Sequence, residues 1–387
     1  MNKKKLIIIA PSPSYGASGN LIEAINEHSR RFTAEGIYAD SIPYGFLKKE
    51  QKKYWSDLTS LESIEYLLEA LYDPDIYFFG ISGRSLDMLE ILFKLDYCRE
   101  YRGEDKIQIT DLSEENGTPY TLGRMSFIGL CLAAKSKGLF RDWETLLEII
   151  FPDSLHTTNE KLRIVEEYTK RLTGRLASWW TDTTYRENSE NLNRYIDIFN
   201  IQAFAMLDLV GLHRESLPLM QTYDFKYISE KKKGEFSVIH TPGLRESHKK
   251  GSDIVKKVAS KIPKVKINIY GKENQLPNKD IIIEKAQSHV CIDKITDTCG
   301  GVGKSGLEAM YFGVPTICSL QDTKAVGRYA DMPAIDVRNE EQLEKELERL
   351  SSDKDYYDRI AKKTKDWSRV LSYESTVEYL DEVLYNG

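Results

Sequence analysis

Short apolar runs, each followed by a loop of glycine and polar residues, recur along the first half of the chain. They stand at residues 5–10, 76–80 and 177–180, and helical patterns follow them. Repetition of strand, loop and helix is typical of α/β units built around a parallel sheet. Between about 110 and 175 the pattern is more helical. The first half is therefore predicted to be an α/β domain.

A second series of apolar runs follows a polar, lysine-rich stretch at residues 224–236, which suits a linker. With helical patterns between them, these runs lie at 236–243, 265–273, 289–295, 313–320 and 333–337. The pattern predicts two Rossmann-like, doubly wound domains, residues 1–228 and 235–368, that face a central cleft. Residues 369–387 are predicted to form a helix that packs back toward the first domain.

Length and composition support this division. The chain has 387 residues, and single cores stop growing at roughly 250–300 residues. Hydrophobic residues make up 41% of the chain, which is enough for packed cores. Five cysteines without a C-x-x-C pair indicate neither a disulfide framework nor a zinc site. The first apolar run is too short for a signal peptide, and no run is long enough to span a membrane, so a cytoplasmic protein is expected.

Charge is distributed unevenly along the chain. Residues 226–304 carry 17 Lys and Arg against 9 Asp and Glu, a local charge of +8. Because the whole chain carries -6, the remainder carries -14. A local positive field fits an anionic ligand better than a long polyanion such as nucleic acid.

Within this basic segment, a strand-to-helix turn reads HTPGLRESHKKG, residues 240–251. It places Arg245, Lys249 and Lys250 on one loop, followed by Gly251. A solvated basic loop and a phosphate-binding loop are both consistent with this turn by itself. The second interpretation gains support from another motif further along the chain.

That motif contains the sequence GKS. Gly303, Lys304 and Ser305 match the end of the P-loop pattern G-x-x-x-x-G-K-[ST], but Thr298 stands where the first glycine should be. A P-loop-like NTPase or kinase therefore remains as an alternative function.

A longer match begins in the same place. The segment GVGKSGLEAMYFGVPTI, residues 301–317, resembles the donor-site segment of GT-B glycosyltransferases, especially family 4. The matching positions are Glu308, Ala309, Met310, Gly313 and Pro315. Backbone N–H groups at a helix start suit a diphosphate. The resemblance thus implies donor binding by Gly303, Lys304, Ser305 and Gly306, with Glu308 accepting the ribose hydroxyls.

The basic turn fits the same resemblance. The family carries an arginine on the loop after the first strand of its second domain, then a lysine five residues later and a glycine. Arg245, Lys250 and Gly251 keep this spacing. The resemblance implies that Arg245 and Lys250 clamp the donor diphosphate and stabilise the negative charge of the leaving group, which makes them the expected catalytic residues.

Three further residues are expected at the donor. Gly16 and Gly19 lie between the first strand and the first helix, on a loop that approaches the donor phosphates in the family. His240 ends the strand before the basic turn, where it would either touch a substrate or serve the fold. One position departs from the family: Gly300 stands where members usually have a glutamate that touches the transferred sugar.

The resemblance implies a retaining glycosyltransferase that takes a UDP- or GDP-sugar as co-substrate. No cofactor is expected besides this co-substrate, and no metal is expected because the sequence has no credible metal motif. A glycan or a lipid-linked glycan is the expected acceptor, and the acidic balance outside the donor segment argues against DNA. The aromatic and basic run at 135–151 would allow peripheral contact with a membrane, or would form a helix on the sheet. A non-catalytic partner subunit with the same fold is the third alternative.

Overall fold

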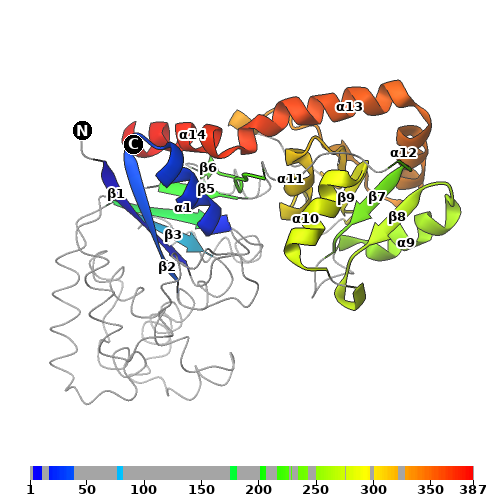
Figure 1. Ribbon diagram of the computed structural model, residues 1–387, viewed down its shortest axis with the longest axis horizontal. Helices are drawn as coiled ribbons and strands as arrows, with labels where there is room; N and C mark the ends of the chain where they lie inside the picture. Colours follow the sequence, from blue (N-terminus) through cyan, green and yellow to red (C-terminus); the bar gives the residue numbers. More distant parts are fainter. Residues whose placement is uncertain are drawn as a thin grey trace, which may run out of the picture. The chain divides into compact units, whose positions relative to one another are not determined.

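A computed structural model provides the structure of the chain. It describes residues 3–10, 17–38, 76–81, 175–180, 201–205, 216–225, 228, 234–242, 250–274, 276–296, 300–320 and 327–386. The chain forms two compact units (Figure 1). Residues 1–203, 212–217 and 383–387 belong to the first unit, and residues 204–211 and 218–382 belong to the second. The division falls earlier in the chain than the lysine-rich stretch at 224–236.

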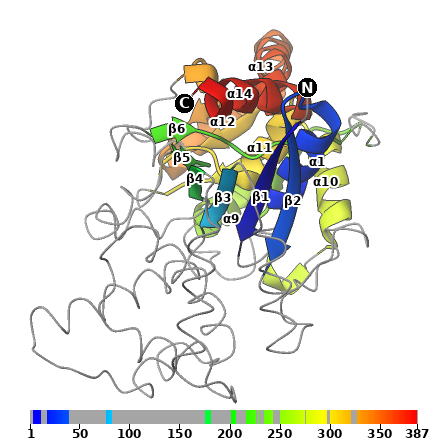
Figure 2. The ribbon, with the colours of Figure 1, turned by 90° about the vertical axis from the view of Figure 1, so that its left-hand side faces the viewer.

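The first unit contains a sheet with the strand order β2-β1-β3-β4-β5-β6 (Figure 2). Its strands are β1 (Lys4–Ala10), β2 (Phe32–Tyr38), β3 (Ile76–Ile81), β4 (Arg175–Trp180), β5 (Ile201–Phe204) and β6 (Ser216–Pro218). The β1–β2, β1–β3 and β3–β4 pairs are parallel. The apolar runs at 5–10, 76–80 and 177–180 are thus confirmed as strands. Three consecutive residues of β1, Leu6, Ile7 and Ile8, are buried, as expected for a strand covered on both faces.

Helix α1 (Ala17–His28) follows β1 and packs against β2. Gly19 is a buried residue in the first turn of this helix, so the expectation that it precedes the helix is wrong. Glycine lacks a Cβ and fits a loop as readily as a helix start, so its presence does not mark where α1 begins. Gly16 lies outside the described residues, as does most of the segment 110–175, including the run at 135–151.

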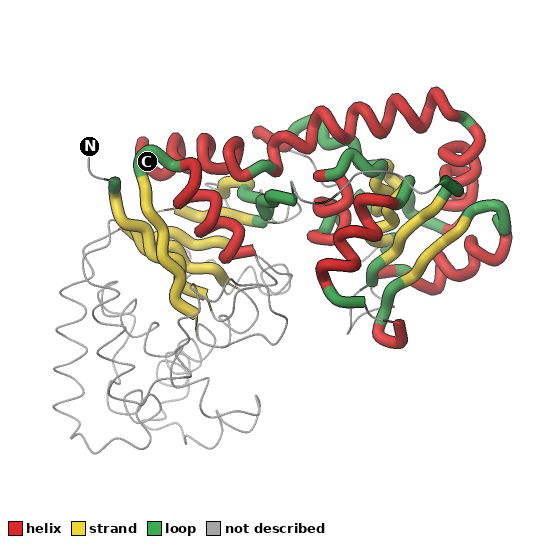
Figure 3. The backbone as a smooth tube through the Cα atoms, viewed as in Figure 1, coloured by secondary structure: helices red, strands yellow, loops and turns green. Residues whose placement is uncertain are grey.

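The second unit is a five-stranded parallel sheet with helices on both faces (Figure 3). Its strand order is β11-β10-β9-β7-β8. The strands are β7 (Ser237–His240), β8 (Lys266–Ile269), β9 (Val290–Lys294), β10 (Thr316–Cys318) and β11 (Ile335–Asp336). All five apolar runs predicted after residue 235 therefore contain a strand.

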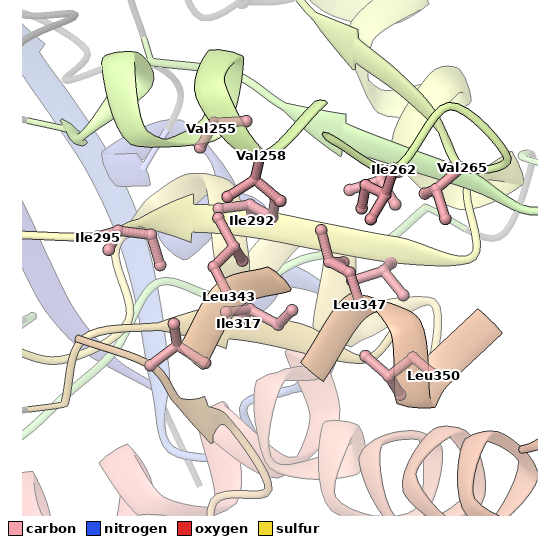
Figure 4. Packing of buried hydrophobic residues seen from close by; sticks show 13 residues of the cluster. Val255, Val258, Ile262, Val265, Ile292, Ile295, Ile317, Leu343, Leu347 and Leu350 are labelled. Carbon is pink, nitrogen blue, oxygen red and sulfur yellow. The ribbon is translucent and has the colours of Figure 1, made fainter. Parts of the chain in front are cut away.

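Successive side chains of the central strands β7 and β9 point to opposite faces of the sheet and pack into two different clusters. Val238 and Ile292 belong to one cluster with helices α9 (Ser252–Lys261) and α12 (Glu340–Ser352), and Figure 4 shows this packing around Ile292 and Ile317. Ile239 and Cys291 belong to the other cluster, with α10 (Asn278–Gln287) and α11 (Lys304–Tyr311). Both central strands are buried throughout, which holds their carboxyl ends in place.

The chain ends in two further helices, α13 (Lys354–Trp367) and α14 (Tyr373–Asn386). Short 3-10 helices lie at Lys272–Asn274, Gly327–Tyr329 and Ser368–Leu371. Helices α12 and α13 begin at side-chain caps, where Asn339 accepts from the Gln342 N–H and Asp353 from the Tyr356 N–H. None of the described helices has the length and apolar character needed to cross a bilayer.

Candidate functional site

The topology of the second sheet indicates where a ligand would bind. Strand β8 lies on one side of β7, whereas β9, β10 and β11 follow on the other side, so the chain changes direction between β7 and β9. Open α/β sheets bind ligands outside the carboxyl ends of the strands at such a switch point. Here β7 ends at His240 and β9 at Lys294. The candidate site is built on these two strand ends.

Lys250 reaches the site because its backbone lies against the end of β9. The Ile295 N–H donates to the Lys250 carbonyl at 3.1 Å. The next residue, Gly251, has φ 72°, and a Cβ there would lie 2.0 Å from the Ile295 carbonyl oxygen. Only glycine combines this left-handed backbone with so close an approach. Gly251 therefore positions Lys250 as well as starting α9.

The side chain of Lys250 contacts a buried carboxylate. Lys250 Nζ lies 3.1 Å from Asp293 Oδ1, and Asp293 Oδ2 accepts from the Gly303 N–H at 2.6 Å. Burial by itself would raise the pKa of Asp293, but the Lys250 and Lys294 charges and the Gly303 N–H bring it down to about 2. Asp293 is therefore an anion at neutral pH. The strand end of β9 holds Lys250 and the residue before α11 together.

Helix α11 begins directly at this carboxylate. Its N-cap is Gly303, which offers no side-chain cap, and its first turn contains no acidic residue. The backbone N–H groups of a first turn form a ready anion site. A Cβ on Gly306 would meet Val302 Cγ1 at 2.5 Å, so this glycine lets α11 pack closely on its surroundings. The hydroxyls of Ser305 and Thr241 contact each other, which ties the α11 start to the end of β7.

Glu308 is the fifth residue of α11, at the start of the second turn of the helix. Its Oε2 lies 2.5 Å from Nζ of Lys285 on α10, and its Oε1 lies 3.6 Å from Nζ of Lys304. The Glu308 and Lys285 side chains are only 5% and 3% exposed, whereas Lys304 is 26% exposed. Burial lowers the pKa of Lys304, which Glu308 partly offsets. The Lys304 ammonium is thus directed toward Glu308.

His240 is fully buried, and both of its ring nitrogens have partners in the second unit. Nδ1 lies 2.8 Å from the Ile292 carbonyl oxygen, and Nε2 lies 2.9 Å from Ser252 Oγ. Because a carbonyl can only accept, Nδ1 carries the proton and Nε2 accepts from the hydroxyl. Burial lowers the pKa of His240 to about 4, so the ring is neutral. His240 ties β7 to β9 and α9, and this structure assigns it a role in the fold instead of donor contact.

The loop before α11 is closed by Lys294. Its buried Nζ donates to the Gly300 carbonyl at 3.1 Å. The Gly301 N–H donates to the Ser319 carbonyl, and Gly301 has φ 82°. Gly300, where the family usually has glutamate, is thus held by a lysine from the strand end.

Two expected site residues, Arg245 and Gly16, lie outside the described part of the chain. Among the described ones, Lys250, Gly303, Lys304, Ser305, Gly306 and Glu308 lie next to the end of β9 or along the first half of α11. His240 instead ends β7, and Gly19 lies in α1 of the first unit. Sequence reasoning missed Asp293, Lys285 and Lys294. Asp293 and Lys294 could have been noticed, because two charges end an otherwise apolar run; Lys285 has no comparable signal.

No known family profile and no curated protein matches the sequence. Solved structures do match over the whole chain. An alpha-glucosyltransferase in complex with UDP-glucose and DNA containing an abasic site aligns with a TM-score of 0.57 at 9% identity, covering 99% of each chain. Anabaena HepE in complex with UDP and glucose aligns with a TM-score of 0.57 at 11% identity, covering 99% of this chain and 100% of HepE.

A third similar structure is an O-GlcNAc transferase mutant from Thermobaculum terrenum. It aligns with a TM-score of 0.52 at 12% identity, covering 100% of this chain and 67% of the transferase. At these identities the likeness concerns the fold. Together with the two α/β units, it shows that this chain has the GT-B fold.

Proposed function

We propose that this protein is a glycosyltransferase that takes its sugar from a nucleoside-diphosphate donor, with UDP-sugars as the first candidates. One observation carries the proposal: Lys250, Gly303 and the start of α11 are gathered at the switch point of the second sheet. The GT-B fold supports it, as do the UDP and UDP-glucose bound in the two most fully aligned relatives described above.

The proposed diphosphate site combines an ammonium group with the N-terminus of α11. Lys250 is 25% exposed, so its ammonium can contact a phosphate oxygen while it stays paired with the buried Asp293. Arg245, on the same turn, is proposed to supply the second cation. Preorganised charges of this kind stabilise the negative charge that develops on a leaving diphosphate. Such an arrangement would act without a divalent metal, and retention of configuration is proposed from the resemblance to family 4.

Glu308 is proposed to meet the ribose. Its Oε2 is engaged with Lys285 at 2.5 Å, whereas Oε1 has the longer contact of 3.6 Å with the partly exposed Lys304. A carboxylate offers about four acceptor sites, so a lysine contact on each oxygen leaves capacity for hydroxyl donors. We therefore place the ribose on the Oε1 side, next to the first turn of α11.

The proposed acceptor is a glycan or a lipid-linked glycan, bound mainly by the first unit. DNA is included among the acceptors to be tested because the structure of a similar alpha-glucosyltransferase was solved in complex with DNA. The charge of -14 outside residues 226–304 argues against a polyanionic acceptor.

A panel of UDP- and GDP-sugars tests the proposal, with nucleotide release measured in the presence of simple glycans, lipid-linked glycans or duplex DNA. Release of UDP or GDP with one donor, coupled to a glycosylated product, is the expected result. Nucleotide binding without release would favour a non-catalytic partner subunit. Magnesium-dependent binding and hydrolysis of ATP would favour the P-loop alternative. The ammonium of Lys304, which a P-loop would direct at phosphate, lies near Glu308 instead.

A further inference from the structure

We propose that Asp293 is a positioning residue, which holds the Lys250 ammonium on one carboxylate oxygen and the residue before α11 on the other. This inference rests on the proposed function, because it assigns how the two diphosphate-binding groups are kept at a defined separation. Asp293 itself is fully buried, whereas Lys250 is 25% exposed. The lysine can therefore touch a ligand and the aspartate acts through it.

The contacts of Asp293 link three elements of the second unit. Oδ1 lies 3.1 Å from Lys250 Nζ, on the turn between β7 and α9. Oδ2 accepts from the Gly303 N–H at 2.6 Å, at the N-cap of α11. Asp293 belongs to β9, and the N–H of Ile295, the residue directly after β9, donates to the Lys250 carbonyl. One rigid strand end thus fixes both the cation and the helix start.

The packing around this carboxylate leaves little room for other arrangements. A Cβ on Gly303 would lie 3.1 Å from Asp293 Oδ2 and 3.3 Å from Lys250 Nζ. A Cβ on Gly306 would lie 3.1 Å from Asp293 Cβ. All three distances are tighter than ordinary contacts between a methyl group and its neighbours, so α11 confines the Lys250–Asp293 pair from its own side.

The negative charge of Asp293 indicates that this residue positions the Lys250 ammonium and does not itself attract the phosphate. A buried carboxylate costs desolvation free energy, and an apolar side chain would join β9 to α11 without that cost. A negative charge beside Lys250 also weakens the positive potential available to a phosphate. Stronger binding of an anion therefore does not explain why Asp293 is present. A defined position of the Lys250 ammonium relative to the leaving group does explain it, because small misplacements of a catalytic group lower turnover strongly.

Turnover and nucleotide affinity should therefore respond differently to Asp293→Asn. The asparagine oxygen can still accept from the Gly303 N–H, but the amide no longer attracts Lys250, and one negative charge is lost. We expect kcat for nucleotide release to fall about tenfold or more. The Kd for UDP, measured by calorimetry, is expected to stay within about threefold of the wild type or to tighten.

A double-mutant cycle with Lys250→Met tests whether Asp293 acts through the lysine. In the Lys250→Met background, Asp293→Asn is expected to change kcat less than about threefold. Asp336 provides a matched control, because it accepts from the Leu320 N–H at 2.9 Å and pairs with Arg338 at 3.1 Å, away from β7 and β9 at the edge strand β11. Asp336→Asn is expected to leave both kcat and the UDP Kd unchanged.

The inference is overturned if Asp293→Asn keeps kcat, if kcat and UDP affinity fall in parallel, or if the full effect persists without Lys250. If Asp293→Asn does not fold, Asp293→Ser removes the same charge while leaving an oxygen near the Gly303 N–H, and it should lower kcat while UDP affinity holds; equal losses of both would count against the inference. A wild-type chain that neither binds UDP or GDP nor releases either from any donor overturns the proposed function, and this inference with it. Wild-type activity with an unaffected Asp293→Asn overturns the inference alone.

Discussion

Lys285 and Glu308 form a buried ion pair between α10 and α11, with Nζ and Oε2 2.5 Å apart. Glu308 therefore contributes to the packing of two helices on one face of the sheet, in addition to its proposed contact with the ribose. Removal of either partner would leave a buried charge without its neutralising contact, which is costly. Any test of the ribose contact has to separate nucleotide recognition from stability.

Comparison of two nucleotides makes this separation for Glu308. We expect wild type to bind UDP about tenfold more tightly than its 2′,3′-dideoxy analogue, since charge-assisted hydrogen bonds contribute roughly 1.5–3 kcal/mol. In Glu308→Gln this ratio should shrink to about twofold, because the amide keeps one acceptor but no charge. Lys285→Met is the control: it should lower the melting temperature yet keep the discrimination. An equal ratio in wild type and Glu308→Gln would refute the ribose contact.

Removal of the proposed clamp should weaken diphosphate binding. Lys250→Ala and Arg245→Ala are each expected to raise the Kd for UDP about tenfold or more, because each removes a charged hydrogen-bond donor. Lys249→Ala, the neighbour on the same turn, should change the Kd much less. Titration calorimetry measures all three, and melting temperatures identify any loss of folding. Unchanged affinity in both clamp variants would contradict the diphosphate site.

Gly251→Ala should unfold the turn that carries Lys250. The new Cβ would lie 2.0 Å from the Ile295 carbonyl oxygen, and the backbone at φ 72° is unfavourable for alanine. We expect a loss of about 2 kcal/mol or more in the free energy of unfolding, together with weaker UDP binding. Gly234→Ala is the control, because its Cβ would meet nothing within 4 Å. Similar urea midpoints for both variants would show that the close approach at Gly251 is unimportant.

The buried His240 should make stability depend on pH in a defined window. Its folded-state pKa is about 4, below the ordinary value of 6.5. Between these two values the unfolded chain binds a proton that the folded chain does not, so stability falls as the pH falls from about 6.5 to about 4. The loss should be on the order of 3 kcal/mol.

His240→Gln tests this window. The amide can donate to the Ile292 carbonyl and accept from Ser252, but it does not titrate. Urea midpoints measured from pH 7 to pH 4 should therefore decline less steeply in this variant than in wild type. The pKa of Asp293 is about 2 in the folded chain, against an ordinary value of 3.8, so its contribution to stability is lost only below about pH 3.8. Most of the pH range in which His240 affects stability therefore contains no contribution from Asp293. Parallel pH profiles in the two proteins would contradict the assignment.

Turnover is expected to persist in excess EDTA. Lys250, Arg245 and the N-terminus of α11 are proposed to supply the positive charge that a divalent ion would otherwise bring to the leaving diphosphate. UDP release with and without the chelator is the measurement. Loss of release in EDTA, with recovery on addition of magnesium, would contradict metal-independence and favour the P-loop alternative.

Much of the second unit was predictable because its information is local. Apolar runs as short as the four residues of β7 lie between loops, and their burial on both faces makes them recognisable as parallel strands. The order of the basic turn and the glycine loop also identified Lys250 and the start of α11. In the first unit, β1, β3 and β4 were predictable for the same reason, whereas Gly19 was misplaced because helix starts carry weak local signals.

The sequence by itself thus indicated the strands of the second unit, their order and the motif residues of the proposed donor site, whereas β2, β5 and β6 of the first unit carried no signal that was noticed. The tertiary structure decided which of these residues meet. Lys250 and Asp293 are 43 positions apart, and they touch because β7 and β9 pair in parallel register. Lys285 and Glu308 are 23 positions apart, on two helices that cover the same sheet face. The periodicity of a segment reports its own burial, but partners distant in the chain are chosen by strand pairing and helix packing, which no single segment encodes.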